Sequence, residues 1–231
     1  MTEELAARLE RLDAAAGPAA ERFDAGGPLG RTAAVLPSAF NPPTHAHQHL
    51  LERALETFGI SSAIALLTTR NVDKGLHGAP LADRIGMLLA LGEAFPGLAV
   101  MAANQARIID QAVALALLLP GVELDFVVGF DTLERLFAPR YYTDMEGELA
   151  PFFARHRILA ANRGEMEAAR VRKWLDANVV QFRPRIEVLE IDEFPASLSS
   201  TQVREALRSD QEALHVAPAV RRYIEERGLY R

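Results

Sequence analysis

Hydrophobic and polar positions follow two periodicities along the chain. Short, mainly apolar runs predict buried strands at residues 32–40, 61–69, 97–104, 123–130, 157–162 and 185–191. Longer stretches with apolar residues at every third or fourth position predict helices at residues 2–14, 45–58, 81–95, 107–119, 131–137 and 165–178. Because strands and helices alternate from residue 32 onward, we expect an α/β fold with a doubly wound, mostly parallel sheet covered by helices on both faces.

The first 30 residues have a different pattern. A helical stretch at residues 2–14 is followed by a segment rich in Gly, Pro and Ala, which is typical of a loop or linker. We therefore expect an N-terminal helical extension and linker at residues 1–30, and one domain with C-terminal helices at residues 31–231. The chain has 231 residues, 49% of them hydrophobic, which is enough to form one full core.

Composition argues against several classes of protein. The net charge of −6 argues against a general nucleic-acid binder, because such proteins bind phosphates through clustered basic residues. The absence of cysteine excludes disulfides and thiolate metal sites. The N-terminal segment is acidic and lacks the features of a signal peptide, and the longest apolar run is interrupted at Pro120, well short of the roughly 20 residues that span a bilayer. We expect a cytoplasmic protein without membrane or nucleic-acid partners; assembly into a homo-oligomer is left open.

The segment LPSAFNPPTHAHQHL, at residues 36–50, is a first candidate site. Pro42 and Pro43 cannot continue a strand ladder, so the chain must leave the sheet there, and Thr44 can cap the helix that follows. Thr44 and His47 share one face of the first helical turn, where free backbone N–H groups and the helix dipole attract anions. This pattern indicates a phosphate site. The alternative is that Thr44 only caps the helix and that the histidines are solvated.

The same segment raises the question of a metal site, because it contains His45, His47 and His49. A spacing of two residues suits a strand, whereas on a helix these side chains diverge. We therefore expect no metal-binding residues here.

A second candidate site is the segment SLSSTQVREAL, late in the chain. Three consecutive hydroxyl residues, Ser199, Ser200 and Thr201, precede a helical pattern. Arg204 projects near the same helix end, where its guanidinium can hold a phosphate through two hydrogen bonds. A capping box between Ser199 and Gln202 is the structural alternative, although a cap requires neither three hydroxyls nor the arginine. Two anion sites at two helix starts suggest a polyphosphate ligand.

The two segments resemble the signatures of a known superfamily. The motif FNPPTHAH, at residues 40–47, is similar to the (H/T)-x-x-H signature of nucleotidyltransferases, and LSSTQVR, at residues 198–204, is similar to their I-S-S-T-x-x-R signature. Within this superfamily the chain most resembles nicotinate and nicotinamide mononucleotide adenylyltransferases, through the segments VDKGL, VVGFD and ILAANRGE and the tail APAVRRYIEERGLY. The resemblance covers about residues 32–231 and implies a Rossmann-like sheet.

The resemblance also implies a reaction and a set of site residues. AMP would pass from ATP, bound with Mg²⁺, to the phosphate of a mononucleotide, as in NAD biosynthesis. The catalytic residues implied are His47 as a donor to the α-phosphate, Thr44 and Arg204 as phosphate ligands, and Lys74 as the cation for the acceptor phosphate. Nucleotide-binding residues implied are Ser38, Ala39, Phe40, Gly129, Asp131, Arg163, Ser199, Ser200 and Thr201. For Asp131, capping of the next helix is an alternative.

Two departures from the family pattern leave other functions open. Pro37 and Ser38 occupy a turn in which the family usually has glycine, and the segment VMAANQARIID lacks the aromatic residue that the family commonly has there. One alternative is therefore a nucleotidyltransferase with a different phosphorylated acceptor. The other is a non-catalytic nucleotide-binding protein.

Overall fold

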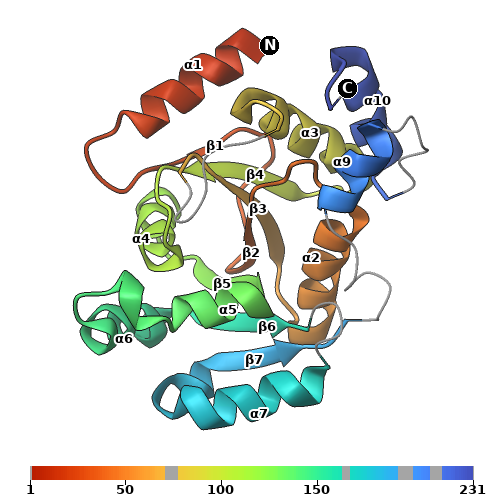
Figure 1. Ribbon diagram of the computed structural model, residues 1–231. Coiled ribbons are helices and arrows are strands. Elements are labelled where there is room, and N and C mark those ends of the chain that lie inside the picture. Colours follow the sequence, from red (N-terminus) through yellow and green to blue (C-terminus); the bar gives the residue numbers. More distant parts are fainter. Residues whose placement is uncertain (1, 71–77, 163–166, 192–199, 209–214, 231) are drawn as a thin grey trace.

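A seven-stranded sheet forms the centre of the part of the chain that the computed structural model describes, residues 2–70, 78–162, 167–191, 200–208 and 215–230 (Figure 1). The strand order is β1-β4-β3-β2-β5-β6-β7. Neighbouring strands are parallel except β1, which pairs antiparallel with β4. The strands are β1 (Ala20–Arg22), β2 (Thr32–Ser38), β3 (Ser62–Thr68), β4 (Leu98–Ala103), β5 (Glu123–Gly129), β6 (Arg157–Ala161) and β7 (Ile186–Leu189).

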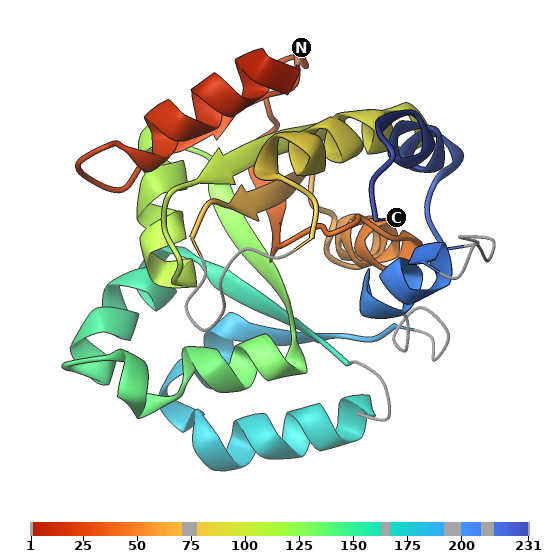
Figure 2. The ribbon, with the colours of Figure 1, turned by 45° about the horizontal axis from the view of Figure 1, so that its top comes forward.

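Helices cover both faces of the sheet (Figures 1 and 2). The helices of one face are α1 (Thr2–Asp13), α2 (His45–Phe58), α3 (Leu81–Ala94), α9 (Ser200–Arg208) and α10 (Pro218–Arg227). Those of the other face are α4 (Ile108–Leu118), α5 (Phe130–Leu136), α6 (Met145–Arg155) and α7 (Ala168–Asn178). Short 3-10 helices are η1 (Pro139–Tyr141) and η2 (Val180–Arg185). Within the described ranges, no helix has the length and apolar character needed to cross a membrane.

The strands supply alternate side chains to two hydrophobic cores. In β2, Ala34 and Leu36 belong to the core beneath α1, α2 and α3. Ala33 and Val35 belong to the core beneath α4, α5, α6 and α7. Successive side chains of a strand point to opposite faces, so a central strand that is covered on both sides must be apolar throughout. This is why the central strands appear in the sequence as continuous apolar runs.

The structure confirms the predicted α/β fold, and the elements predicted from residue 32 onward are present with ends that agree to within three residues. The sequence pattern did not indicate β1 or α6. β1 has only three residues, Ala-Glu-Arg, which is too short and too polar to stand out. The N-cap residue of α6 is Asp144, whose carboxylate accepts a hydrogen bond from the Gly147 N–H at 3.0 Å, but the helix also contains Pro151, a residue that usually interrupts helices.

The N-terminal residues pack closely against the rest of the chain. The Asn104 side chain, beyond β4, accepts a hydrogen bond from the Ala19 N–H and donates one to the Gly17 carbonyl, both at 2.9 Å. The Asp24 carboxylate accepts a hydrogen bond from the Val100 N–H at 2.7 Å. The predicted linker therefore contains an edge strand of the sheet, while the domain boundary itself stays a prediction.

The strand order creates a topological switch point at β2. The chain continues from β2 to β3 and β4 on one side, and then returns to β5, β6 and β7 on the other. In open sheets of this kind, ligands bind beyond the carboxyl ends of the strands at the switch point. Val35 of β2 pairs with Phe126 of β5, and each strand runs three residues further, to Ser38 and Gly129. These two strand ends therefore lie at the same level, where a ligand is expected.

Candidate functional site

The turn between β2 and α2 carries much of the predicted site. Pro37 and Ser38 are the last residues of β2 and still pair with β3. Their placement in a turn, which came from the comparison with the family pattern, is therefore wrong, and the strand predicted at residues 32–40 does run through them; the turn begins only at Ala39. Phe40 has a φ of 42°, in the left-handed region, which reverses the chain toward α2.

Thr44 is the N-cap residue of α2, as predicted. Its backbone is extended, its side chain is buried, and its carbonyl accepts hydrogen bonds from the N–H groups of His47 and Gln48 at 3.0 and 3.3 Å. α2 therefore begins just beyond the carboxyl end of β2. At that position the dipole and the first N–H groups of a helix favour an anion.

The His47 imidazole folds back over this cap. Its Nδ1 accepts a hydrogen bond from the Thr44 backbone N–H at 3.0 Å and lies 2.9 Å from the Thr44 hydroxyl. Because a backbone N–H can only donate, Nδ1 carries no proton, and the neutral ring has its proton on Nε2. Nε2 lies 3.1 Å from Ser38 Oγ and donates to it. With the ring held against Phe40, at 5.0 Å between centroids, the fold places an imidazole N–H donor at the end of β2.

The start of α9 meets the same turn from a distant part of the sequence. The Ser200 hydroxyl donates to the Pro42 carbonyl at 2.9 Å, and Nη1 of Arg204 donates to the Asn41 carbonyl at 2.7 Å. Nη2 of Arg204 donates to the Thr201 hydroxyl at 3.0 Å. The two segments that the sequence marked as separate anion sites therefore lie together.

Arg84 also holds this turn, although the sequence interpretation did not include it in the site. It is buried in α3, with Nη1 donating to the Ala39 carbonyl at 3.2 Å and Nε donating to the Ala79 carbonyl at 2.8 Å. Burial lowers the pKa of its guanidinium below the usual value. The available signal was an arginine within the apolar helical pattern LADRIGMLLALGEAF, because arginine is rarely buried without bound partners.

Other predicted residues lie around this cluster or outside the described ranges. Gly129 ends β5 and is the N-cap residue of α5, so the alternative role of Asp131 as the cap is wrong. Asp131 is exposed in the first turn of α5, and within the described residues it forms no hydrogen bond or ion pair with the other predicted site residues. Lys74, Arg163 and Ser199 lie outside the described residues.

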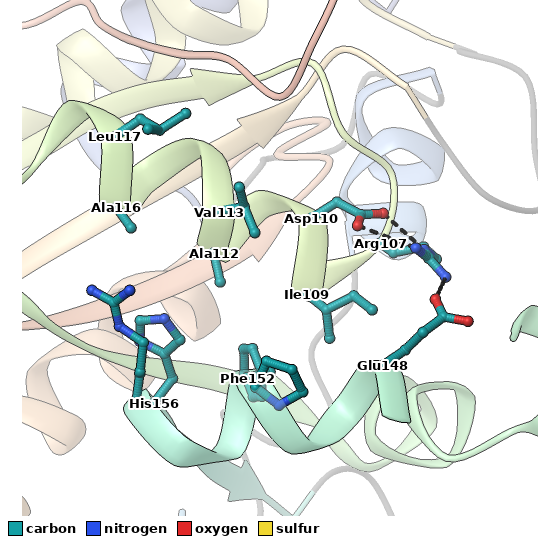
Figure 3. A pocket seen from close by; sticks show the side chains of 12 residues that line it. Arg107, Ile109, Asp110, Ala112, Val113, Ala116, Leu117, Glu148, Phe152 and His156 are labelled. Atoms are coloured by element: carbon teal, nitrogen blue, oxygen red, sulfur yellow. Dashed lines mark hydrogen bonds and ion pairs between the residues drawn. The ribbon is translucent and has the colours of Figure 1, made fainter. Parts of the chain in front are cut away.

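A pocket that contains none of the predicted site residues lies between α4 and α6 (Figure 3). Its volume is about 460 Å³. At one end, Arg107 forms ion pairs with Asp110 at 2.7 Å and Glu148 at 2.6 Å. At the other end lies His156, which directly follows α6. The pocket therefore belongs to the face of the sheet opposite α2 and α9.

His156 is a buried titratable group in this region. It is 7% exposed and its ring packs against Phe126 and Phe152. Within the described part of the chain, its Nδ1 has no hydrogen-bond partner. Burial, with a smaller contribution from the positive charge of Arg155, lowers the pKa of His156 to about 4. The folded protein therefore keeps this ring neutral at pH values where an unfolded chain would protonate it.

The free energy of unfolding is expected to fall by about 3 kcal/mol as the pH decreases from 6.5 to 4, because over this range the unfolded state binds the proton at His156 and the folded state does not. Urea unfolding at pH 7 and pH 4 measures this loss. In His156→Gln, which cannot take up the proton, the part of the acid destabilisation due to His156 should disappear. An equal loss of stability in the variant and the wild type would contradict the assignment.

The fold and the site together define a class of protein. A Rossmann-like parallel sheet, with two helix starts that bring hydroxyls, an imidazole N–H and a guanidinium to its switch point, is the arrangement of a nucleotidyltransferase. The chain belongs to the cytidylyltransferase-like family, whose model matches residues 35–206.

Relatives of this chain include named adenylyltransferases. It is 30% identical over 194 residues to a protein of Schizosaccharomyces pombe named as a nicotinamide mononucleotide adenylyltransferase, covering 77% of this chain and 76% of that protein. It is also 30% identical over 211 residues to a protein of Anaeromyxobacter dehalogenans named as a nicotinate-nucleotide adenylyltransferase, covering 87% of this chain and 98% of that protein. The resemblance stated from the sequence motifs is confirmed.

A solved structure has the same fold. Nicotinic acid mononucleotide adenylyltransferase of Plasmodium falciparum, complexed with NaAD, aligns with a TM-score of 0.66 over 87% of this chain and 98% of that chain. The sequence identity is 16%, so the likeness concerns the fold alone. It confirms the Rossmann-like architecture that the sequence predicts.

Proposed function

We propose that the protein is an adenylyltransferase of NAD biosynthesis, which transfers AMP from ATP to the phosphate of nicotinate or nicotinamide mononucleotide and releases pyrophosphate. The observation that carries the proposal is the meeting of the α2 and α9 starts at the turn after β2, where Arg204 and Ser200 bond to the carbonyls of that turn. Relatives named for this activity, aligned over 77% and 87% of the chain, support the choice of substrates. A step of NAD biosynthesis also agrees with the cytoplasmic location expected from the sequence.

The proposed reaction requires no protein nucleophile. An oxygen of the acceptor phosphate attacks the α-phosphorus of ATP, the bond between that phosphorus and the bridging oxygen breaks, and pyrophosphate leaves with the negative charge. The protein aligns the two phosphates and stabilises the charge as it shifts. In the proposed complex the Nε2–H of His47, which donates to Ser38 in the structure, donates to the α-phosphate, and Thr44 binds a phosphate oxygen.

ATP is proposed to bind as its Mg²⁺ complex, with the cation held mainly by phosphate oxygens and water. Arg204, with the hydroxyls of the α9 start, holds the β- and γ-phosphates. The adenosine lies over the end of β5. The residues proposed to contact the nucleotide are Ser38, Ala39, Phe40, Gly129, Asp131, Arg163, Ser199, Ser200 and Thr201.

Pyrophosphate release tests the proposed function. The purified protein is incubated with ATP, Mg²⁺ and one acceptor at a time, and both pyrophosphate and the dinucleotide are measured. We expect both products with nicotinate mononucleotide or nicotinamide mononucleotide. Pyrophosphate release only with a phosphorylated acceptor other than these two mononucleotides would identify a different nucleotidyltransferase. ATP binding without release in the presence of any acceptor would identify a non-catalytic nucleotide-binding protein.

Lys74→Ala is expected to raise the KM for the mononucleotide by about tenfold while the KM for ATP changes little, because we assign Lys74 to the acceptor phosphate in the ground state. Steady-state kinetics with each substrate varied separately measures the two constants. Lys173→Ala is the matched control, since Lys173 is the only other lysine of the chain and lies exposed on α7. A rise in the KM for ATP alone would mean that Lys74 serves the other substrate.

A further inference from the structure

The Asn41 side chain joins three separated parts of the chain. Asn41 is 8% exposed, and its Oδ1 accepts hydrogen bonds from the Ala79 N–H at 3.1 Å and from the Tyr230 hydroxyl at 2.8 Å. Its backbone carbonyl accepts the hydrogen bond from Arg204 described above. The turn after β2 is therefore held at Asn41 by the segment that leads into α3, by α9 and by the C-terminal end of the chain.

The space around Asn41 shows that this contact is close packed. Gly78 has a φ of 87°, and a Cβ atom at that position would lie 2.3 Å from the Asn41 Nδ2. A side chain there would therefore displace Asn41. Glycine satisfies both requirements, the positive φ and the close approach of the backbone.

The end of α10 is shaped to bring Tyr230 back to this turn. α10 packs against α3 (Figure 1) and ends at Gly228, which has a φ of 59°. The N–H groups of Gly228 and Leu229 then bond to carbonyls of the last helical turn, so that the chain reverses. Tyr230 itself has a φ of 68°, and its hydroxyl lies 3.9 Å from the Met87 sulfur as well as beside Asn41. Burial raises the pKa of Tyr230 above its usual value, so the hydroxyl keeps its proton and donates a hydrogen bond to the Asn41 Oδ1.

We propose that Tyr230 is a positioning residue for the nucleotide site: its hydroxyl fixes Asn41 and thereby the turn that carries Phe40 and the cap of α2. The expected effect on kcat rests on the proposed function. The hydrogen bond between Tyr230 and Asn41 can be tested without measuring activity. Phe40 and His47 pack together, and the Thr44 cap sets the His47 ring. A shift of the turn would therefore move the imidazole donor.

Tyr230→Phe removes only the hydroxyl and tests this role. We expect kcat for pyrophosphate release to fall about fivefold, the effect of losing one neutral hydrogen bond. Amide hydrogen exchange at Ala79, followed by NMR, should become faster by a similar factor, because its acceptor Asn41 is less well held. Tyr223→Phe is the matched control: Tyr223 lies in α10, before the reversal that carries Tyr230, and its hydroxyl bonds to Asp83 at 3.1 Å and not to the turn after β2. This control should leave kcat and the exchange at Ala79 unchanged.

A double-mutant cycle with Asn41→Ala separates positioning from general stability. If Tyr230 acts through Asn41, Tyr230→Phe should lower kcat little further in the Asn41→Ala background. Additive losses, or equal effects of Tyr230→Phe and Tyr223→Phe, would overturn the proposal. Unchanged exchange at Ala79 in Tyr230→Phe would overturn it as well, and this measurement does not require Asn41→Ala to fold. A wild-type protein without transferase activity would refute the proposed function but would leave the exchange test of the contact intact.

Discussion

His47→Ala is expected to lower the rate of adenylyl transfer by a factor of about 10² to 10³ while the affinity for ATP changes little. The Nε2–H of His47 is the donor that the fold places at the end of β2, held by Thr44 through Nδ1. A hydrogen bond that strengthens as charge develops in the transition state contributes to kcat rather than to ground-state binding. Single-turnover kinetics measures the rate, and calorimetry measures ATP binding.

His45→Ala is the matched control for this experiment. His45 lies on the same helical turn, but it is exposed, and its backbone N–H, which the substitution leaves in place, donates to the His215 carbonyl. We expect the control to keep the wild-type rate. Thermal melting of both variants is needed, because His47→Ala also removes the acceptor for the Thr44 N–H. A folded His47→Ala variant within a few-fold of the wild-type rate would exclude His47 from the chemistry.

Arg204→Ala is expected to weaken ATP binding by a factor of about 10², which corresponds to the loss of charge-assisted hydrogen bonds worth about 1.5–3 kcal/mol. In the structure its two terminal nitrogens already bond in two directions, to the Asn41 carbonyl and to the Thr201 hydroxyl. Arg204→Lys should recover only part of the affinity, because an ammonium group lacks the planar two-point geometry. Isothermal titration calorimetry with ATP and Mg²⁺ measures both variants.

A surface arginine provides the comparison for Arg204. Arg222 lies exposed on α10, where it pairs with Glu93 at 2.8 Å, and Arg222→Ala should bind ATP as the wild type does. If Arg204→Ala also binds ATP normally, Arg204 only joins α9 to the turn after β2. The start of α9 would then be a structural cap and not part of a polyphosphate site.

Local patterns in the sequence were sufficient for most of the fold. The apolar runs identified the central strands because those strands are buried on both faces. Pro42, Pro43 and Thr44 marked the end of β2 and the start of α2, because two successive prolines offer no backbone N–H to a ladder and threonine caps helices. β1 was missed because its three residues pair at the edge of the sheet and have no apolar pattern of their own.

The sequence by itself determined the two helix starts and their chemistry, since the spacing of Thr44 and His47, and of Thr201 and Arg204, follows from the geometry of one helical turn. Only the tertiary structure decided that these starts meet. The Ser200 hydroxyl bonds to a carbonyl 158 positions earlier, and Tyr230 bonds to a side chain 189 positions earlier. The roles of Arg84 and Tyr230 depend on the packing of α3 and α10 around one turn, and no local periodicity encodes such packing. Contacts of this kind arise from the order of the strands and the burial of whole helix faces, which are properties of the complete chain.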